Sequence, residues 1–148
     1  MVVLDASVIL KWFYPARTEP GADVAREFRE RFLDGDLTIV VPCFAMYECA
    51  SSMRHSQYRL PPSTVKEHVR DLWGLGLTVV RVTRRLLWTA TEVSFVHGGS
   101  VYDAYYFATA QFSQCACVTA DRRAHRHVKS IPWIHLLRDV SDVSAFDD

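Results

Sequence analysis

The sequence predicts a single α/β domain in which helices cover a parallel β-sheet. Short runs rich in Val, Ile and Leu alternate with longer amphipathic stretches, which is typical of parallel strands joined by helices. A length of 148 residues suits one domain with a sizeable core. The chain is 49% hydrophobic and 23% charged, which excludes disorder for most of it, and no repeat or long linker divides it.

The elements follow from local patterns along the chain. Five apolar runs are the candidate strands, at residues 2–4, 38–41, 78–82, 116–119 and 133–137. Apolar residues that recur every three or four positions predict helices at 22–33, 43–58, 63–74, 84–97 and 100–113. Proline and glycine mark the boundaries, since Pro15 and the Pro20-Gly21 pair separate an early helix from the next one.

Charge, cysteines and hydropathy restrict the class of protein. Seventeen basic and seventeen acidic residues cancel, so a charged partner must be met by a local patch. The four cysteines include no CxxC pair, which disfavours a zinc site and indicates reduced thiols. No targeting segment is visible and no stretch reaches the ~20 apolar residues that span a bilayer, so we expect a cytoplasmic protein with no membrane partner.

Four acidic residues are expected at one edge of the sheet. Asp5 comes directly after the first strand, and Asp121 follows the fourth in CVTAD. Glu48 lies about two turns beyond the second strand, and Asp103 lies in the first turn of the helix that begins near Ser100. Because ligands of an open parallel sheet bind outside the carboxyl ends of its strands, these acids are candidates for a functional site.

Each acid also has a purely structural interpretation. Asp5 and Asp121 could cap the helices that follow them, and Ser100 with Asp103 has the spacing of a capping box. Glu48 fits this interpretation least, because it lies within a helix, where a salt bridge to Arg54 or another arginine would be needed.

Several carboxylates without paired cations can instead hold a divalent metal ion. Mg²⁺ and Mn²⁺ prefer hard oxygen ligands and offset the repulsion between carboxylates. A metal ion held in this way can generate hydroxide and stabilise an in-line phosphoryl displacement. On this interpretation the edge of the sheet is a hydrolytic site for phosphate esters.

Over nearly its whole length the chain resembles the PIN-domain ribonucleases, of the VapC toxin kind found in prokaryotic toxin–antitoxin pairs. The resemblance rests on VVLDASVILKWF, MYECASSMRH, VYDAYYFATAQ and CVTADRR. It implies a five-stranded parallel sheet with helices on both faces and an acidic pocket that binds Mg²⁺ or Mn²⁺ for cleaving RNA. The residues that it assigns to catalysis and metal binding are Asp5, Glu48, Asp103 and Asp121, with Ser7 and Thr119 as accessory hydroxyls.

The resemblance also implies domain limits and partners. Residues 1–138 form the PIN-like nuclease domain, and residues 139–148 are an acidic C-terminal tail, which we expect to order only if it docks. A cognate VapB-type antitoxin is the implied protein partner, and a homodimer is the implied assembly. Some of the aromatic surface near Trp12 is a candidate dimer contact. Packing is the simpler role for these rings and for the aromatic residues Tyr102, Tyr105, Tyr106 and Phe107.

The cations that follow Asp121 are candidates for binding RNA. Arg122 and Arg123 would lie beside the metal pocket, where a phosphate backbone must run. A solvated helix face is an equally good interpretation of such a charge run, and antitoxin binding is a third.

Four other classes of protein have partly similar sequence features. A haloacid-dehalogenase-like phosphatase needs a second Asp where Ser7 stands, and a dinucleotide-binding domain needs a GxGxxG motif that is missing. A catalytically silent binding module of the same fold would be expected to have lost one of the acids. A housekeeping RNA-processing nuclease remains open, because the sequence does not reveal which RNA is cut.

Overall fold

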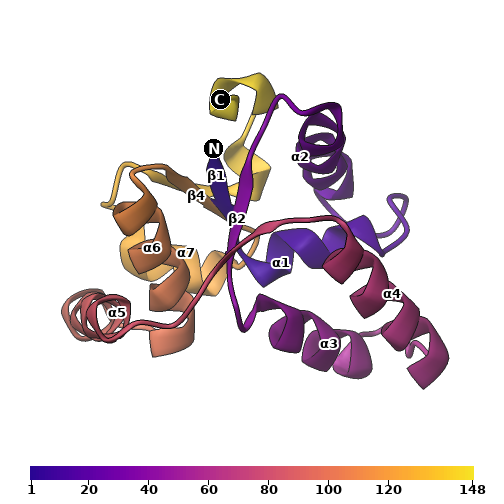
Figure 1. Ribbon diagram of the computed structural model, residues 1–148, viewed down its shortest axis with the longest axis horizontal. Coiled ribbons are helices and arrows are strands. Elements are labelled where there is room, and N and C mark those ends of the chain that lie inside the picture. Colours follow the sequence, from indigo (N-terminus) through magenta and orange to yellow (C-terminus); the bar gives the residue numbers. More distant parts are fainter.

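The computed structural model describes all residues from Met1 to Asp148 and contains one five-stranded, all-parallel sheet (Figure 1). The strands are β1 (Val2–Leu4), β2 (Ile39–Pro42), β3 (Thr78–Val80), β4 (Ala116–Thr119) and β5 (Ile134–Leu136). Their order is β3-β2-β1-β4-β5, so β1 is central and β3 and β5 are the edges. The predicted fold class is confirmed, including WIHLL as the source of the fifth strand.

Seven α-helices lie on the two faces of this sheet. They are α1 (Ala6–Ile9), α2 (Ala22–Asp34), α3 (Ala45–His55), α4 (Pro62–Gly74), α5 (Arg84–His97), α6 (Val101–Ser113) and α7 (Arg122–Val128). Figure 1 shows α1 to α4 on one side of the strands and α5 to α7 on the other. The helix predicted for 43–58 is shorter than expected, because the backbone becomes extended at Ser56.

The segment after β5 packs against α2. It contains two 3₁₀-helices, η2 (Leu137–Asp139) and η3 (Val143–Phe146), and Val143 is fully buried. The ring of Phe146 lies 5.2 Å from that of Phe28, centre to centre, and Arg31 Nε donates to Asp147 at 2.6 Å. We expected this segment to order only on docking, and it docks on the domain itself.

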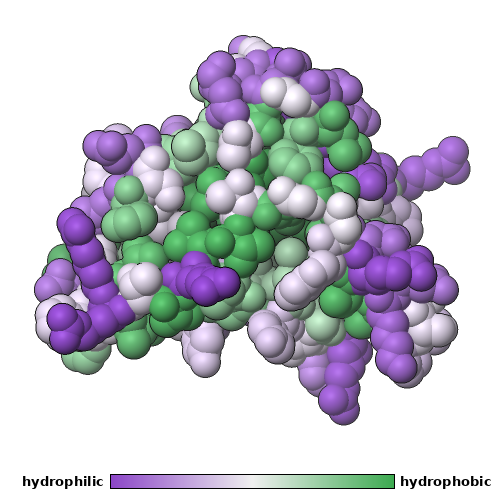
Figure 2. Space-filling view, viewed as in Figure 1, coloured by the Kyte–Doolittle hydropathy of each residue, from purple (hydrophilic) through white to green (hydrophobic).

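Apolar side chains also gather on the surface. Figure 2 shows hydrophobic residues across the middle of one face, where Figure 1 places β2 and the segment that leads to α5. Val82, Trp88 and Tyr102 are all more than half exposed. Tyr102, in the first turn of α6, is exposed over much of its surface, while its ring packs edge-on against Phe44 at 5.8 Å between ring centres.

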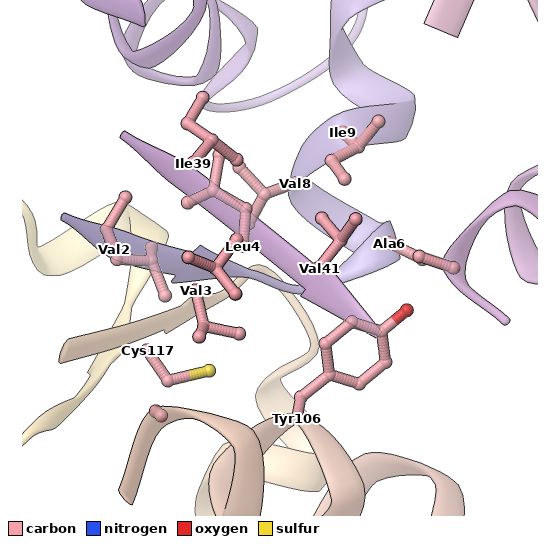
Figure 3. Packing of buried hydrophobic residues seen from close by; sticks show 14 of the residues in the cluster. Val2, Val3, Leu4, Ala6, Val8, Ile9, Ile39, Val41, Tyr106 and Cys117 are labelled. Carbon is pink, nitrogen blue, oxygen red and sulfur yellow. The ribbon is translucent and has the colours of Figure 1, made fainter. Parts of the chain in front are cut away.

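The core lies around the central strand. Val2, Val3 and Leu4 are fully buried, because α6 covers one face of β1 and the α1–α2 side covers the other (Figure 3). Tyr106 of α6 reaches under the end of the sheet toward α1, with its hydroxyl at the rim of the core (Figure 3).

The aromatic residues near the start of the chain are packing residues. Trp12, in the 3₁₀-helix η1 (Leu10–Trp12), is buried, and its indole Nε1 donates to the carbonyl of Ala25 at 2.7 Å. Tyr14 is buried as well. These two rings therefore offer no surface for a dimer contact.

Candidate active site

The predicted acids converge on the carboxyl edge of the sheet. Asp5 follows the central strand β1, and Glu48 lies in the first part of α3, just beyond the neighbouring strand β2. Asp103 lies in the first turn of α6, which packs under β1, β2 and β4. The chain crosses to opposite faces of the sheet on the two sides of β1, and ligands of such sheets bind at this switch point.

Asp5 is the centre of a hydrogen-bond network. Its carboxylate accepts from the hydroxyl of Ser7 at 2.9 Å and from the hydroxyl of Thr119. Burial raises the pKa of Asp5, these hydrogen bonds oppose that effect, and the charge of Asp103 adds to it. Ser7 Oγ also accepts from the N–H of Ala120 at 2.9 Å, so the network joins the ends of β1 and β4.

Asp5 is also a helix cap. One of its oxygens accepts from the N–H of Ser7 at 3.3 Å and caps α1. The other oxygen accepts from the hydroxyls of Ser7 and Thr119, so the capping role does not exclude a functional one.

Glu48 is a half-buried carboxylate without a cation. Its Oε2 accepts from the hydroxyl of Tyr106 at 2.5 Å. Burial, followed by the charges of Asp5 and Asp103, raises the pKa of Glu48 from 4.5 to about 7. None of the chain's ion pairs involves Glu48, so the salt bridge considered as the alternative, for which Arg54 was one candidate, is absent.

Asp103 and Asp121 are placed differently. Ser100 donates its hydroxyl to Asp103 at 2.7 Å and accepts from the Asp103 N–H at 3.1 Å, so this pair forms the predicted cap of α6. Asp121 is exposed and caps α7, accepting from the N–H of Arg123 at 2.7 Å and of Ala124 at 3.1 Å. Its N–H donates to the hydroxyl of Thr119 at 3.0 Å, and Thr119 donates to Asp5, so Asp121 adjoins the Asp5 network while its exposed carboxylate lies at the margin of the cluster.

The sequence model of the PIN domain matches residues 2–130. The chain belongs to the PIN domain family. The resemblance seen in the sequence motifs is therefore confirmed, although no curated protein is similar enough in sequence to count as a relative.

Solved structures share this PIN fold at low sequence identity. A toxin–antitoxin complex from Klebsiella pneumoniae superposes with a TM-score of 0.68 at 11% identity, over 95% of this chain and 100% of that one. VapC20 of Mycobacterium tuberculosis, described as a sarcin-ricin loop cleaving toxin, gives a TM-score of 0.65 at 12% identity, over 88% and 95%. FitAcB of Neisseria gonorrhoeae gives 0.61 at 14% identity, over 92% and 96%.

Tyr106 is the residue of this PIN-domain site that the sequence analysis missed. It was treated as a packing ring, and it is one, but its hydroxyl is also the hydrogen-bond partner of Glu48. A signal was present, because Tyr106 follows Asp103 by three residues and residues at this spacing share a helix face.

The donors at this edge fit a divalent ion that keeps part of its water shell. No three His, Cys, Asp or Glu side chains lie close enough together to hold a metal ion among themselves. Asp5, Glu48 and Asp103 each turn an oxygen toward a hydroxyl donor, and no cation pairs with any of the three. Mg²⁺ commonly binds through one or two carboxylates plus waters, so unpaired hard oxygens of this kind suit it.

The surface beyond the acids carries the predicted cations. Arg122 and Arg123 are both exposed in the first turn of α7, and neither forms an ion pair. None of the helices combines the length and apolar character needed to cross a bilayer.

Proposed function

We propose that this PIN domain is a metal-dependent endoribonuclease and the toxin of a toxin–antitoxin pair. The observation that carries the proposal is the group Asp5, Glu48 and Asp103. Burial raises the pKa values of Asp5 and Glu48, the charge of Asp103 adds to both shifts and that of Asp5 adds to the shift of Glu48, while no Arg or Lys pairs with any of the three. A protein retains such mutual repulsion at low cost only where a cation binds, and a hydrolytic metal ion is the cation that suits carboxylates at a sheet edge.

Each residue has a defined part in this proposal. Asp5, Glu48 and Asp103 would hold Mg²⁺ or Mn²⁺ together with water molecules that complete its shell, and Asp121 would contribute from the margin. When bound, the ion supplies an activated water and stabilises the charge that develops on the phosphate. Ser7 and Thr119 hold the Asp5 carboxylate in place.

The remaining contacts are to the substrate and to Glu48. Tyr106 orients Glu48 through its hydroxyl. Arg122 and Arg123 are proposed to hold the RNA backbone, because exposed guanidinium groups without a carboxylate partner bind phosphate well.

The partners in the proposal draw support from proteins of the same fold. VapC20 is described as cleaving the sarcin-ricin loop, and the Klebsiella structure is a toxin–antitoxin complex. RNA as substrate and a VapB-type antitoxin as partner are proposed on that basis. A homodimer is also proposed, for which the exposed apolar side chains Val82, Trp88 and Tyr102 offer surface, and the cytoplasm is the compartment in which such a substrate is met.

The decisive experiment is an RNA cleavage assay with matched variants. The purified protein should cleave RNA in Mg²⁺ or Mn²⁺ and stop when EDTA is added. Asp5→Asn, Glu48→Gln, Asp103→Asn and Asp121→Asn should each abolish cleavage, whereas Glu92→Gln, an exposed acid on α5, should have no effect. Because Asn caps a helix as well as Asp does, loss of activity in the Asp5 or Asp121 variant cannot be assigned to a lost cap.

The outcomes separate the proposal from its alternatives. Cleavage that persists in EDTA contradicts the metal mechanism, and RNA binding without cleavage in either metal indicates a silent binding module. Inhibition of the wild-type protein by the product of an adjacent small gene would support the toxin role, whereas an active enzyme encoded alone would indicate a housekeeping nuclease.

A further inference from the structure

A concave site lies beside the carboxylate cluster. It is a pocket of about 290 Å³ lined by Lys11, Pro20, Gly21, Ala120, Arg122, Leu137 and Arg138. Its three charged residues are all cations, and they come from three separate elements, η1, α7 and η2. No acidic residue lines the pocket, so its walls favour an anion.

The pocket shares a wall with the Asp5 network. Ala120, which lines it, lies between Thr119 and Asp121 and donates its N–H to Ser7. Thr119 in turn donates to Asp5. The pocket therefore lies at the same edge of the sheet as the acids, on the side toward β5.

The cations differ in how far they are already paired. Lys11 is bound to Glu19, and both side chains are largely buried, so Lys11 serves as a fixed wall. Arg138 forms one ion pair, with its neighbour Asp139 at 3.3 Å, and this pair is solvent-exposed and easily exchanged. Arg122 has no ion pair at all.

Two guanidinium groups are thus available over one pocket next to the acids. Guanidinium groups bind phosphate through two parallel hydrogen bonds, which a carboxylate-lined metal site cannot do. We propose that this pocket binds a phosphate of the RNA backbone adjacent to the one that is cleaved, with Arg122 and Arg138 as its anion-binding groups. The proposal rests on the proposed nuclease function and adds to it the side on which the RNA continues, over the segment after β5.

The test is RNA binding in EDTA, where no cleavage occurs. Fluorescein-labelled single-stranded RNA is titrated with the wild-type protein, Arg138→Gln, Arg122→Gln and the double variant. The titrations are repeated at salt concentrations from about 50 to about 300 mM, over which counterion release changes the affinity. Each single variant should bind more weakly and lower the log–log salt slope by ~0.7, and the double variant by about twice that amount. Arg70→Gln, which changes an exposed arginine of α4 outside the pocket, is the matched control and should leave the slope unchanged.

The outcomes for the pocket and for the nuclease are distinct. If the wild-type protein cleaves RNA but Arg138→Gln keeps the slope of Arg70→Gln, the pocket proposal is overturned and the nuclease stands. If the pocket variants bind RNA like wild type but bind the antitoxin more weakly, the pocket proposal is overturned, and the pocket instead binds a carboxylate of the antitoxin. Absence of both RNA binding and cleavage in the wild type would overturn the proposed function together with the pocket.

Discussion

Replacing Glu48 by Gln should stabilise the metal-free protein at neutral and alkaline pH. Gln removes the charge but keeps an oxygen that can accept from the hydroxyl of Tyr106. The pKa of Glu48 is raised to about 7 in the folded protein from an ordinary 4.5, so folding favours its protonated form. Below pH 4.5 the wild-type residue is neutral in both states, and its stabilising contribution is complete. That contribution is lost as pH rises toward 7, when the folded protein must carry the charge.

The magnitude follows from the same pKa. A change from 4.5 to about 7 corresponds to ~3 kcal/mol, at about 1.4 kcal/mol for each step of one in pKa. Glu48 is only half-buried, and solvent screens part of its charge, so we expect a gain of ~1–2 kcal/mol for Glu48→Gln at pH 8. For a domain of this size that gain raises the melting temperature by ~2–8 °C.

The assay is thermal unfolding in EDTA at pH 5 and pH 8, with Glu92→Gln as the exposed control. The gain should be small at pH 5, full at pH 8 and reduced when Mn²⁺ is added, because the ion stabilises only the protein that binds it. A Glu48→Gln protein that melts lower than wild type at pH 8, or whose advantage is the same at both pH values, would refute the reasoning and indicate a structural role for the charge.

Three further predictions concern neighbouring contacts. Tyr106→Phe removes the hydrogen-bond donor to Glu48, so the pKa of Glu48 should rise further. When Mn²⁺ binding is monitored through the melting temperature, the variant should need a higher Mn²⁺ concentration than wild type. An unchanged titration would contradict this role of Tyr106. Thr119→Val removes a donor to Asp5 while nearly preserving the shape of the side chain, and it should lower the free energy of unfolding by ~1–3 kcal/mol. Urea denaturation should show a lower midpoint with an unchanged dependence of that free energy on urea concentration. An unaltered midpoint would exclude the network as a source of stability. Asp147→Asn breaks the ion pair to Arg31 of α2, whose guanidinium lowers the pKa of Asp147, so the melting temperature should fall at pH 7. The difference from wild type should shrink as pH falls below the ordinary aspartate pKa and vanish below the lowered pKa of the folded protein. A difference that persists in still stronger acid would disprove the ionic origin.

The parts of the site that could be predicted from the sequence are those tied to one strand end or one helix start. Asp5 follows an apolar strand directly, and Asp103 lies at a recognisable helix start, so their places in the fold follow from local patterns. Glu48 was predicted correctly to lie in the helix after β2. That no arginine pairs with it depends on how distant elements pack around it, which the sequence does not show.

The features that local patterns did not predict depend on long-range packing. The bond between Tyr106 and Glu48 joins residues on two helices on opposite faces of the sheet, so no pattern within either helix specifies it. The pocket that contains Arg138 combines η1, α7 and the segment after β5, which are brought together only by the order of the strands. The docking of the final segment on α2 could not be predicted either. Its few apolar residues, Val143 and Phe146 among them, do not recur at a helical or strand spacing that would indicate which surface they pack against.

The contact between Thr119 and Asp5 has a consequence for synthesis. A growing polypeptide must reach residue 119 of 148 before Thr119, whose hydroxyl donates to Asp5, has been made. The strand β4, which pairs with β1 and so places Thr119 beside Asp5, is completed at the same residue. Because the first and last parts of the candidate site are separated by most of the chain, a partly translated molecule carries Asp5, Glu48 and Asp103 without the contacts that fix their arrangement.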